Sequence, residues 1–182
     1  MHVYMFTYHG HGTWMPDHRH GFVRRGQGVQ APDRSLAKLY RDKQRLPAVV
    51  FTPPMQDTVA RTLSDAGRFI DATVHGVSVD PTHVHVLVSW KHDRVWKSMR
   101  RSLRTAASKA LNAAHGRRDW FADQPSRKCV RSAEHFDYLL LEYLPKHGGV
   151  VWRRAISVDK AQQRDGASPI SVIEQFRRRR SQ

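Results

Sequence analysis

The sequence is poor in cysteine, in acidic residues and in long apolar runs, and each of these shortages excludes a class of protein. Cys129 is the one cysteine in 182 residues, so neither an internal disulfide nor a cysteine-based zinc site can form. No apolar run approaches the roughly 20 residues of a membrane-spanning helix, and we expect no membrane anchor and no signal peptide. A reducing cytoplasm is the expected compartment, with association to the nucleoid in a bacterial cell.

The shortage of acidic residues leaves a large positive charge. Lys and Arg number 31 against 16 Asp and Glu, which gives a formal net charge of +15. Such a domain binds polyanions whatever else it does. Charge alone does not separate nucleic acid from an anionic membrane, but no terminal segment reads as a basic amphipathic helix with a bulky aromatic face. We therefore expect nucleic acid, and no membrane, as the partner.

Apolar periodicity predicts an α+β fold. The expected order is a strand at residues 3–8, a helix at about 55–70, a hairpin of strands at 73–79 and 82–90, a helix to about 115 capped by Asp93, a strand at 127–131 and a helix from Ser132. This β-α-β-β-α-β order predicts a ferredoxin-like or RRM-like antiparallel sheet with helices on one face and an appended C-terminal helix. The open sheet face would then lie beneath the last helix.

The chain is expected to form one domain. Residues 1–152 carry all the predicted elements, and residues 24–47 read as a basic, Gly- and Pro-containing insertion with a short helix at about 35–45. Residues 153–182 turn polar and end in an Arg-rich run, which indicates a tail that adds non-specific phosphate attraction.

Two histidines stand one residue apart in the strand expected at 82–90. Because side chains alternate on a strand, His83 and His85 share one face and Val84 and Val86 the other. Two imidazoles on a rigid apolar strand form half of a divalent-metal site. For an isolated His-x-His pair, solvated histidines on an open face are the commoner case, so a second element must decide.

That second element is the helix expected to begin at Ser132 and to end at Gly148-Gly149. Tyr143 and His147 lie four residues apart and therefore on one helical face, where both could turn towards one metal site. Pro145 between them lacks an N–H and is expected to kink the helix. A core tyrosine with a satisfied hydroxyl is the commoner role for Tyr143 taken alone.

Tyr138 is a second tyrosine in the same helix. It lies five residues before Tyr143, about 140° away around a regular α-helix, and so on a different face. We therefore expect only one of these two tyrosines, Tyr143, to face the metal site.

Three segments, taken in order, resemble the HUH single-tyrosine transposases, in particular the branch of REP-associated tyrosine transposases. Asp80-Pro81-Thr82-His83-Val84-His85-Val86-Leu87-Val88 is similar to the family's His-hydrophobic-His strand, and Tyr143 is similar to its nucleophile ahead of a Gly-containing stop. Gly12-Thr13-Trp14-Met15-Pro16 is similar to a segment that follows the first strand in this branch. The likeness covers roughly residues 1 to 152. Where the family commonly has an amide side chain one turn after the tyrosine, this chain has His147.

The resemblance implies a metal-dependent nickase and strand transferase for single-stranded DNA. His83, His85 and His147 would hold Mg²⁺ or Mn²⁺, and Tyr143 would attack the scissile phosphate to leave a 5′-phosphotyrosine and a free 3′-hydroxyl. The implied substrate is hairpin-associated DNA in transposition, bound by a monomer or a homodimer. The residues expected to contact DNA are Trp14, Arg19, Arg24, Arg25, Lys97, Arg100, Arg101 and Arg104, although a solvated basic face accounts for any single one equally well.

Two other functions fit parts of the sequence. A non-catalytic, domesticated nucleic-acid-binding protein of RRM-like shape would stack bases on aromatic residues of its central strands, whereas the strand at 82–90 offers histidines, with Trp90 only at its end. A histidine-metal hydrolase for small molecules explains neither the charge nor the tyrosine helix.

Overall fold

The computed structural model describes residues 1–155 apart from His20, Arg25 and Gln124. Most of the Arg-rich tail expected at 153–182, and the expected DNA contact Arg25, therefore lie outside the described residues. Within them, no helix combines the length and the apolar character needed to cross a bilayer.

A five-stranded antiparallel sheet forms the centre of the α+β fold. Its strand order is β6-β1-β5-β4-β7, so β5 lies in the middle with β1 and β4 on either side. The strands are β1 (His2–His9), β4 (Thr73–Val79), β5 (His83–Trp90), β6 (Ser126–Cys129) and β7 (Val150–Arg153). The predicted sheet is confirmed, and β7 is an additional edge strand that the sequence did not predict.

Helices cover one face of the sheet, as predicted. α2 (Pro53–Ala66) and α3 (Trp96–His115) pack on the side to which β5 presents its valines. A continuous apolar core joins Leu63 of α2 and Leu103 of α3 to Val86, all at most 1% exposed. A 3₁₀ turn, η1 (Gly67–Phe69), extends α2 towards β4. The predicted cap of α3 is wrong, because Val95 rather than Asp93 precedes the first turn and no side chain caps it.

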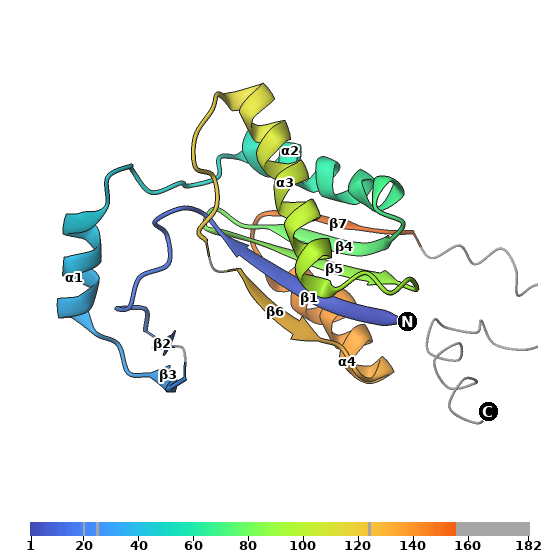
Figure 1. Cartoon of the computed structure of the whole chain (residues 1–182), viewed down its shortest axis with the longest axis horizontal. Helices are drawn as coiled ribbons and strands as arrows, with labels where there is room; N and C mark the ends of the chain where they lie inside the picture. Colours follow the sequence, from blue (N-terminus) through green and yellow to red (C-terminus); the bar gives the residue numbers. More distant parts are fainter. Residues whose placement is uncertain (20, 25, 124, 156–182) are drawn as a thin grey trace, which may run out of the picture.

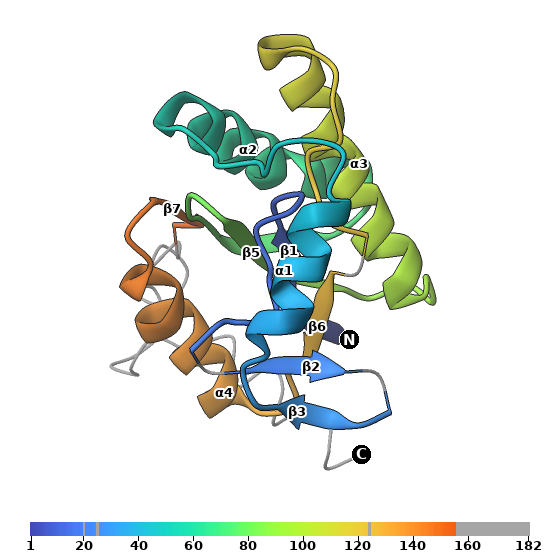
Figure 2. The ribbon, with the colours of Figure 1, turned by 90° about the vertical axis from the view of Figure 1, so that its left-hand side faces the viewer.

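The opposite face carries the appended C-terminal helix. It starts as α4 (Ala133–Asp137), continues as the π-helical turn η2 (Tyr138–Tyr143) and closes with the 3₁₀ turn η3 (Leu144–Lys146). A second apolar cluster joins Leu139 and Leu144 to Leu87 of β5. Figure 2 shows α4 on the other side of the sheet from α2 and α3. The histidine-bearing face of β5 is therefore covered by the tyrosine segment.

A small lobe stands at one end of the sheet (Figures 1 and 2). It holds the hairpin of β2 (Phe22–Arg24) and β3 (Gly28–Gln30), which was not predicted, and α1 (Arg34–Lys43), which agrees with the helix predicted at about 35–45. Asp33 caps α1 by accepting a hydrogen bond from the Leu36 amide at 2.8 Å. An ion pair of 2.6 Å between Arg41 and Asp17 ties α1 to the loop that leaves β1.

Candidate metal and tyrosine site

Two of the candidate ligands are set by strand register. β1 and β5 pair so that Thr7 lies opposite His85 and His9 lies opposite His83. The four side chains consequently share the face covered by the tyrosine segment. His85 is buried at 4% exposure, whereas His83 keeps 22% of its side chain exposed. The strand thus presents one imidazole inside the protein and one at its rim.

The third candidate ligand, His147, does not lie on the helix as predicted but in the segment that follows it. Ser132 caps the helix as expected, its hydroxyl accepting a hydrogen bond from the His135 amide. However, the helix ends at Lys146, and His147 has an extended backbone with φ −76° and ψ 136°. Its ring lies 4.5 Å from that of His85 and 5.2 Å from that of His83, centroid to centroid. The break at Pro145, rather than a continuous helical face, therefore brings His147 to the site.

These three imidazoles form a cluster that could hold a metal ion. Each of His83, His85 and His147 offers one nitrogen, and these atoms all lie within 4.8 Å of one another. Burial lowers the pKa of His85 to about 2, helped by the neighbouring His83 and His147. Burial also lowers the pKa of His83, although Asp80 opposes that effect. Both rings are thus held neutral, which is the form that binds a metal.

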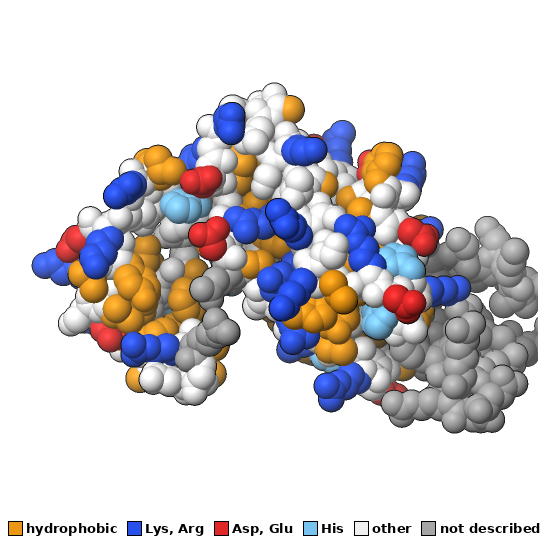
Figure 3. All heavy atoms as spheres, in the orientation of Figure 1, with side chains coloured by type: hydrophobic (Ala, Val, Ile, Leu, Met, Phe, Trp, Pro, Cys, Tyr) orange, Lys and Arg blue, Asp and Glu red, His pale blue; other side chains and the backbone are white. Residues whose placement is uncertain are grey.

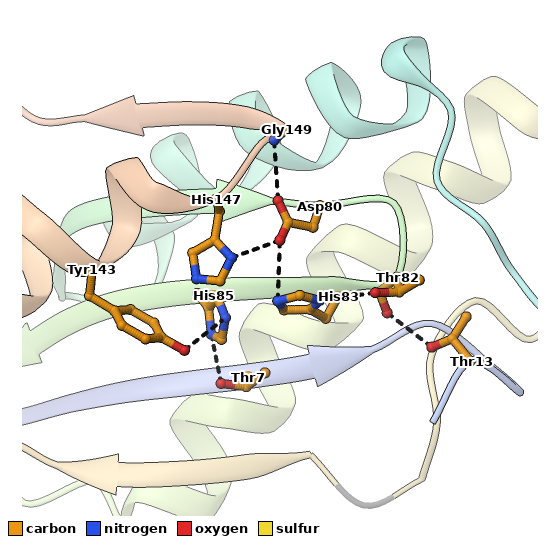
Figure 4. A network of polar contacts seen from close by, with 9 residues as sticks. All are labelled: Thr7, Thr13, Asp80, Thr82, His83, His85, Tyr143, His147 and Gly149. Atoms are coloured by element: carbon orange, nitrogen blue, oxygen red, sulfur yellow. Dashed lines mark hydrogen bonds and ion pairs between the residues drawn. The ribbon is translucent and has the colours of Figure 1, made fainter. Parts of the chain in front are cut away.

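Each ring of the cluster has an oxygen partner at Nδ1. The Thr82 hydroxyl lies 3.0 Å from His83 Nδ1, and the Thr7 hydroxyl lies 2.8 Å from His85 Nδ1. The third partner is Asp80, whose Oδ2 lies 2.7 Å from His147 Nδ1 (Figure 4). Oxygen partners at Nδ1 make Nε2 the nitrogen that each ring can offer to a metal, the arrangement usual for metal-binding histidines, and Nε2 of His83 also lies 3.3 Å from Asp80 Oδ2. The donor set therefore fits a divalent ion.

Sequence reasoning missed these three oxygen partners. Thr82 and Asp80 stand one and three residues before His83 of the His-x-His motif, and that proximity was a usable signal. Thr7 could be found only from the β1–β5 register. The same register reveals His9, whose ring lies 5.9 Å from that of His83. Burial lowers the pKa of His9 to about 4, with smaller contributions from His83 and His18.

The predicted nucleophile lies against the cluster. The Tyr143 hydroxyl is 3.5 Å from His85 Nε2, at the outer limit of a hydrogen bond, and its ring centroid is 5.0 Å from that of His147. Burial, then Tyr138 and Asp80, raise the pKa of Tyr143. The phenol is therefore in its protonated form at neutral pH.

The prediction that Tyr138 faces away from Tyr143 is wrong. The six residues from Tyr138 to Tyr143 form a π-helical turn, in which hydrogen bonds run from residue i to i+5, so the two side chains return to nearly the same side. Their ring centroids are 6.3 Å apart. Tyr138 is 43% exposed, and its ring contacts that of Tyr143.

One group of expected DNA contacts lies close to this site. The Trp14 ring is 38% exposed and lies 6.5 Å from His9, the neighbour of His83. Arg19 lies in the loop after β1 and Arg24 ends β2, and both are exposed. These residues border the end of the sheet at which His83 sits.

The other group lies on α3, across the sheet from the histidines. The guanidinium groups of Arg100 and Arg104 bind the loop that precedes β6. Arg100 donates to the Pro125 carbonyl at 2.7 Å, and Arg104 donates to the Phe121 carbonyl at 2.9 Å. Lys97 and Arg101 are exposed. Figure 3 shows Lys and Arg side chains gathered over α3 and β6 on this face.

Comparison with known proteins gives matches in structure alone. No protein-family model and no curated protein matches the sequence. The structure is similar to that of a REP-associated tyrosine transposase bound to a REP hairpin, with a TM-score of 0.42 and 11% identity; the match covers 76% of this chain but only 62% of that protein. It is also similar to a candidate transposase from Deinococcus radiodurans, with a TM-score of 0.46 and 13% identity over 81% of this chain and 92% of that one. What the site can do follows from this chain's own residues.

Proposed function

We propose that the protein is a metal-dependent nickase and strand transferase for single-stranded DNA, acting at hairpin-associated sites in DNA transposition. The observation that carries this proposal is the Tyr143 hydroxyl, 3.5 Å from a nitrogen of a three-histidine cluster. A nucleophile beside a cation site is the arrangement that phosphoryl transfer requires, because the attacked phosphate must be neutralised where the nucleophile meets it. The net charge of +15 supports a polyanionic substrate.

The chemistry is a transesterification. A divalent ion held by His83, His85 and His147 would polarise the scissile phosphate and stabilise the negative charge on the departing oxygen. The Tyr143 oxygen attacks phosphorus in line, the P–O3′ bond breaks, and the phenolic proton ends on the released 3′-hydroxyl. The products are a 5′-phosphotyrosine and a free 3′ end. Because the phosphodiester is conserved, another 3′-hydroxyl can reverse the step and join a new strand.

The donor set distinguishes the two expected ions. Mg²⁺ strongly prefers oxygen ligands and keeps several of its waters. A site with three imidazole nitrogens suits transition metals better. We therefore propose that Mn²⁺ binds this cluster more tightly than Mg²⁺.

DNA would lie along the exposed rim of the cluster. Trp14 offers an aromatic face for a base, and Arg19 and Arg24 offer charges for phosphates on the same end of the sheet. Lys97 and Arg101 on α3 would contact a longer or double-stranded part of the same substrate around β6. Either a monomer or a homodimer could present these surfaces.

The test is formation of a covalent adduct. A single-stranded oligonucleotide carrying a hairpin from the DNA flanking the gene is labelled at its 3′ end and incubated with protein and Mn²⁺. We expect a labelled band of protein size on a denaturing gel, lost with EDTA and lost in the double variant His83→Ala, His85→Ala. DNA affinity in that variant should stay within a few-fold, because it depends on many Lys and Arg contacts.

The matched control is His92→Ala, which removes a histidine beyond the other end of β5 and should form the adduct normally. An adduct of undiminished yield from the double variant in EDTA would disprove the role of the cluster. Tight DNA binding by the wild-type protein without any adduct, across metals and flanking sequences, would favour the non-catalytic nucleic-acid-binding protein instead.

A further inference from the structure

Asp80 connects the two segments that supply the histidines. It follows β4 in the turn before β5, and its side chain is only 13% exposed. One carboxylate oxygen, Oδ2, lies 2.7 Å from His147 Nδ1 and 3.3 Å from His83 Nε2. The other, Oδ1, accepts a hydrogen bond from the Gly149 amide at 3.2 Å (Figure 4). The Asp80 carboxylate thus contacts the imidazoles of His83 and His147 and also the backbone two residues after His147.

His147 depends on this contact because it lies in a connection rather than in a helix or strand. Its segment runs from the end of η3 at Lys146 to the start of β7 at Val150. Gly149 passes so close to β4 that a Cβ there would lie 1.9 Å from the carbonyl oxygen of Val79. Asp80 holds this close approach from the β4 side through the Gly149 amide, and it holds the His147 ring at the same time.

The three oxygen partners of the cluster differ in what they impose on the rings. A threonine hydroxyl, as on Thr7 and Thr82, can donate or accept, so it leaves either ring nitrogen free to carry the proton. A carboxylate only accepts, so Nδ1 of His147 must carry the proton and Nε2 must keep its lone pair. Asp80 is therefore the partner that decides the tautomer.

We propose that Asp80 is a positioning residue for the metal site: it fixes His147 in the tautomer and orientation in which Nε2 can bind a metal. This inference rests on the proposed metal-binding role of the cluster. It also explains how a histidine at residue 147 can serve as a ligand, since a partner that holds the proton at Nδ1 keeps the Nε2 lone pair available to a metal.

The test is Asp80→Asn, which keeps the size and shape of the side chain. Its carbonyl oxygen can still accept from the Gly149 amide, while its NH₂ group donates to His147 Nδ1. That donation moves the imidazole proton to Nε2 and blocks the metal-binding nitrogen. We expect the ¹⁵N-NMR spectrum of the metal-free variant to show His147 protonated at Nε2, where the wild-type protein shows protonation at Nδ1.

Metal affinity is the second readout. Loss of an oriented partner typically weakens a metal site by about 10- to 100-fold, and we expect Mn²⁺ affinity, measured by calorimetry without DNA, to fall in that range. Asp65→Asn is the matched control, because it removes the same charge from an exposed ion pair on α2 and should leave the affinity unchanged. Circular dichroism and the melting temperature check that both variants are folded.

A double-variant cycle separates positioning from loop stability. In a His147→Gln background the tautomer no longer matters, so adding Asp80→Asn should cause little further loss of Mn²⁺ affinity. An equal loss in both backgrounds, or an unchanged His147 tautomer in Asp80→Asn, would overturn the proposal. Since neither measurement uses DNA, failure of the nicking reaction would leave this result standing. A wild-type protein that binds no Mn²⁺ would refute the metal site, while the tautomer would still test Asp80.

Discussion

The substitution Tyr143→Phe tests the nucleophile with the smallest possible change. It removes one hydroxyl, whose nearest polar partner is His85 Nε2 at 3.5 Å. A typical hydrogen bond contributes a net 0.5–1.5 kcal/mol, on the order of 1 kcal/mol, and one this long and partly exposed lies at the low end or below. The ring keeps its contacts with His85 and His147 at centroid distances of 5.3 and 5.0 Å. We therefore expect the free energy of unfolding to change by less than about 0.5 kcal/mol.

The cleavage reaction, unlike the free energy of unfolding, should change completely in Tyr143→Phe. Phenylalanine has no oxygen with which to attack phosphorus, so the covalent adduct should disappear from the denaturing gel while DNA affinity, measured by fluorescence anisotropy, stays the same. Tyr138→Phe is the matched control, since it makes the same change five residues earlier on an exposed ring. That variant should form the adduct.

The proximity of Tyr138 makes the comparison informative. With ring centroids 6.3 Å apart, Tyr138 is the one side chain in η2 that could replace the missing nucleophile. A faint adduct in Tyr143→Phe that vanishes when Tyr138→Phe is added would show that Tyr138 can attack in place of Tyr143. An adduct of wild-type yield in Tyr143→Phe, or its loss only in Tyr138→Phe, would refute the assignment of Tyr143.

Two further predictions concern charge. Alanine at Arg19 and Arg24 together, and separately at Lys97 and Arg101, should each lower the slope of log affinity against log salt by about 1.4 for single-stranded DNA, at about 0.7 per phosphate contact, in anisotropy titrations. A pair whose removal leaves the slope unchanged does not contact DNA. Burial, helped by Arg154, lowers the pKa of His75 from 6.5 to about 4. The unfolded chain therefore binds a proton that the folded protein does not, and stability that is complete above pH 6.5 falls by up to roughly 1.4 kcal/mol per pH unit from this residue as the pH drops towards 4. Denaturant melts of His75→Gln between pH 6.5 and 4 should show a shallower fall; an identical fall would contradict the assignment.

The sheet and its histidine face could be predicted because their signals are local. The alternation in β5 specifies which residues share a face, and the apolar spacing of α2 and α3 specifies what covers the other one. β2, β3 and β7 were missed, whereas β6, which is as short as β7, was predicted at the place just before the helix that begins at Ser132. The strand character of β2, β3 and β7 comes from the pairing partner rather than from their own sequence.

The site was predicted only where it depends on spacing along one strand. His83 and His85 share a face by simple alternation. Thr7 and His9 come from a strand more than 70 residues earlier, and only the antiparallel register places them beside the pair. The position of Tyr138 was predicted from a period of 3.6 residues, which a π-helical turn does not follow.

The irregular helix is what allows one segment to bring both Tyr143 and His147 to the histidine cluster. An α-helix continued to residue 147 would place Tyr143 and His147 one above the other on the same face. Instead the π turn and the 3₁₀ turn at Pro145 divide the segment, so that the tyrosine stays on the sheet while the histidine returns to the β4–β5 turn at Asp80. Gly76 of β4 permits the close packing, since a Cβ there would lie 2.7 Å from Leu144 Cδ1. The distance between Tyr143 and the cluster is therefore set by side-chain packing on the sheet and by the Asp80 contact, and a regular helix would not reproduce it.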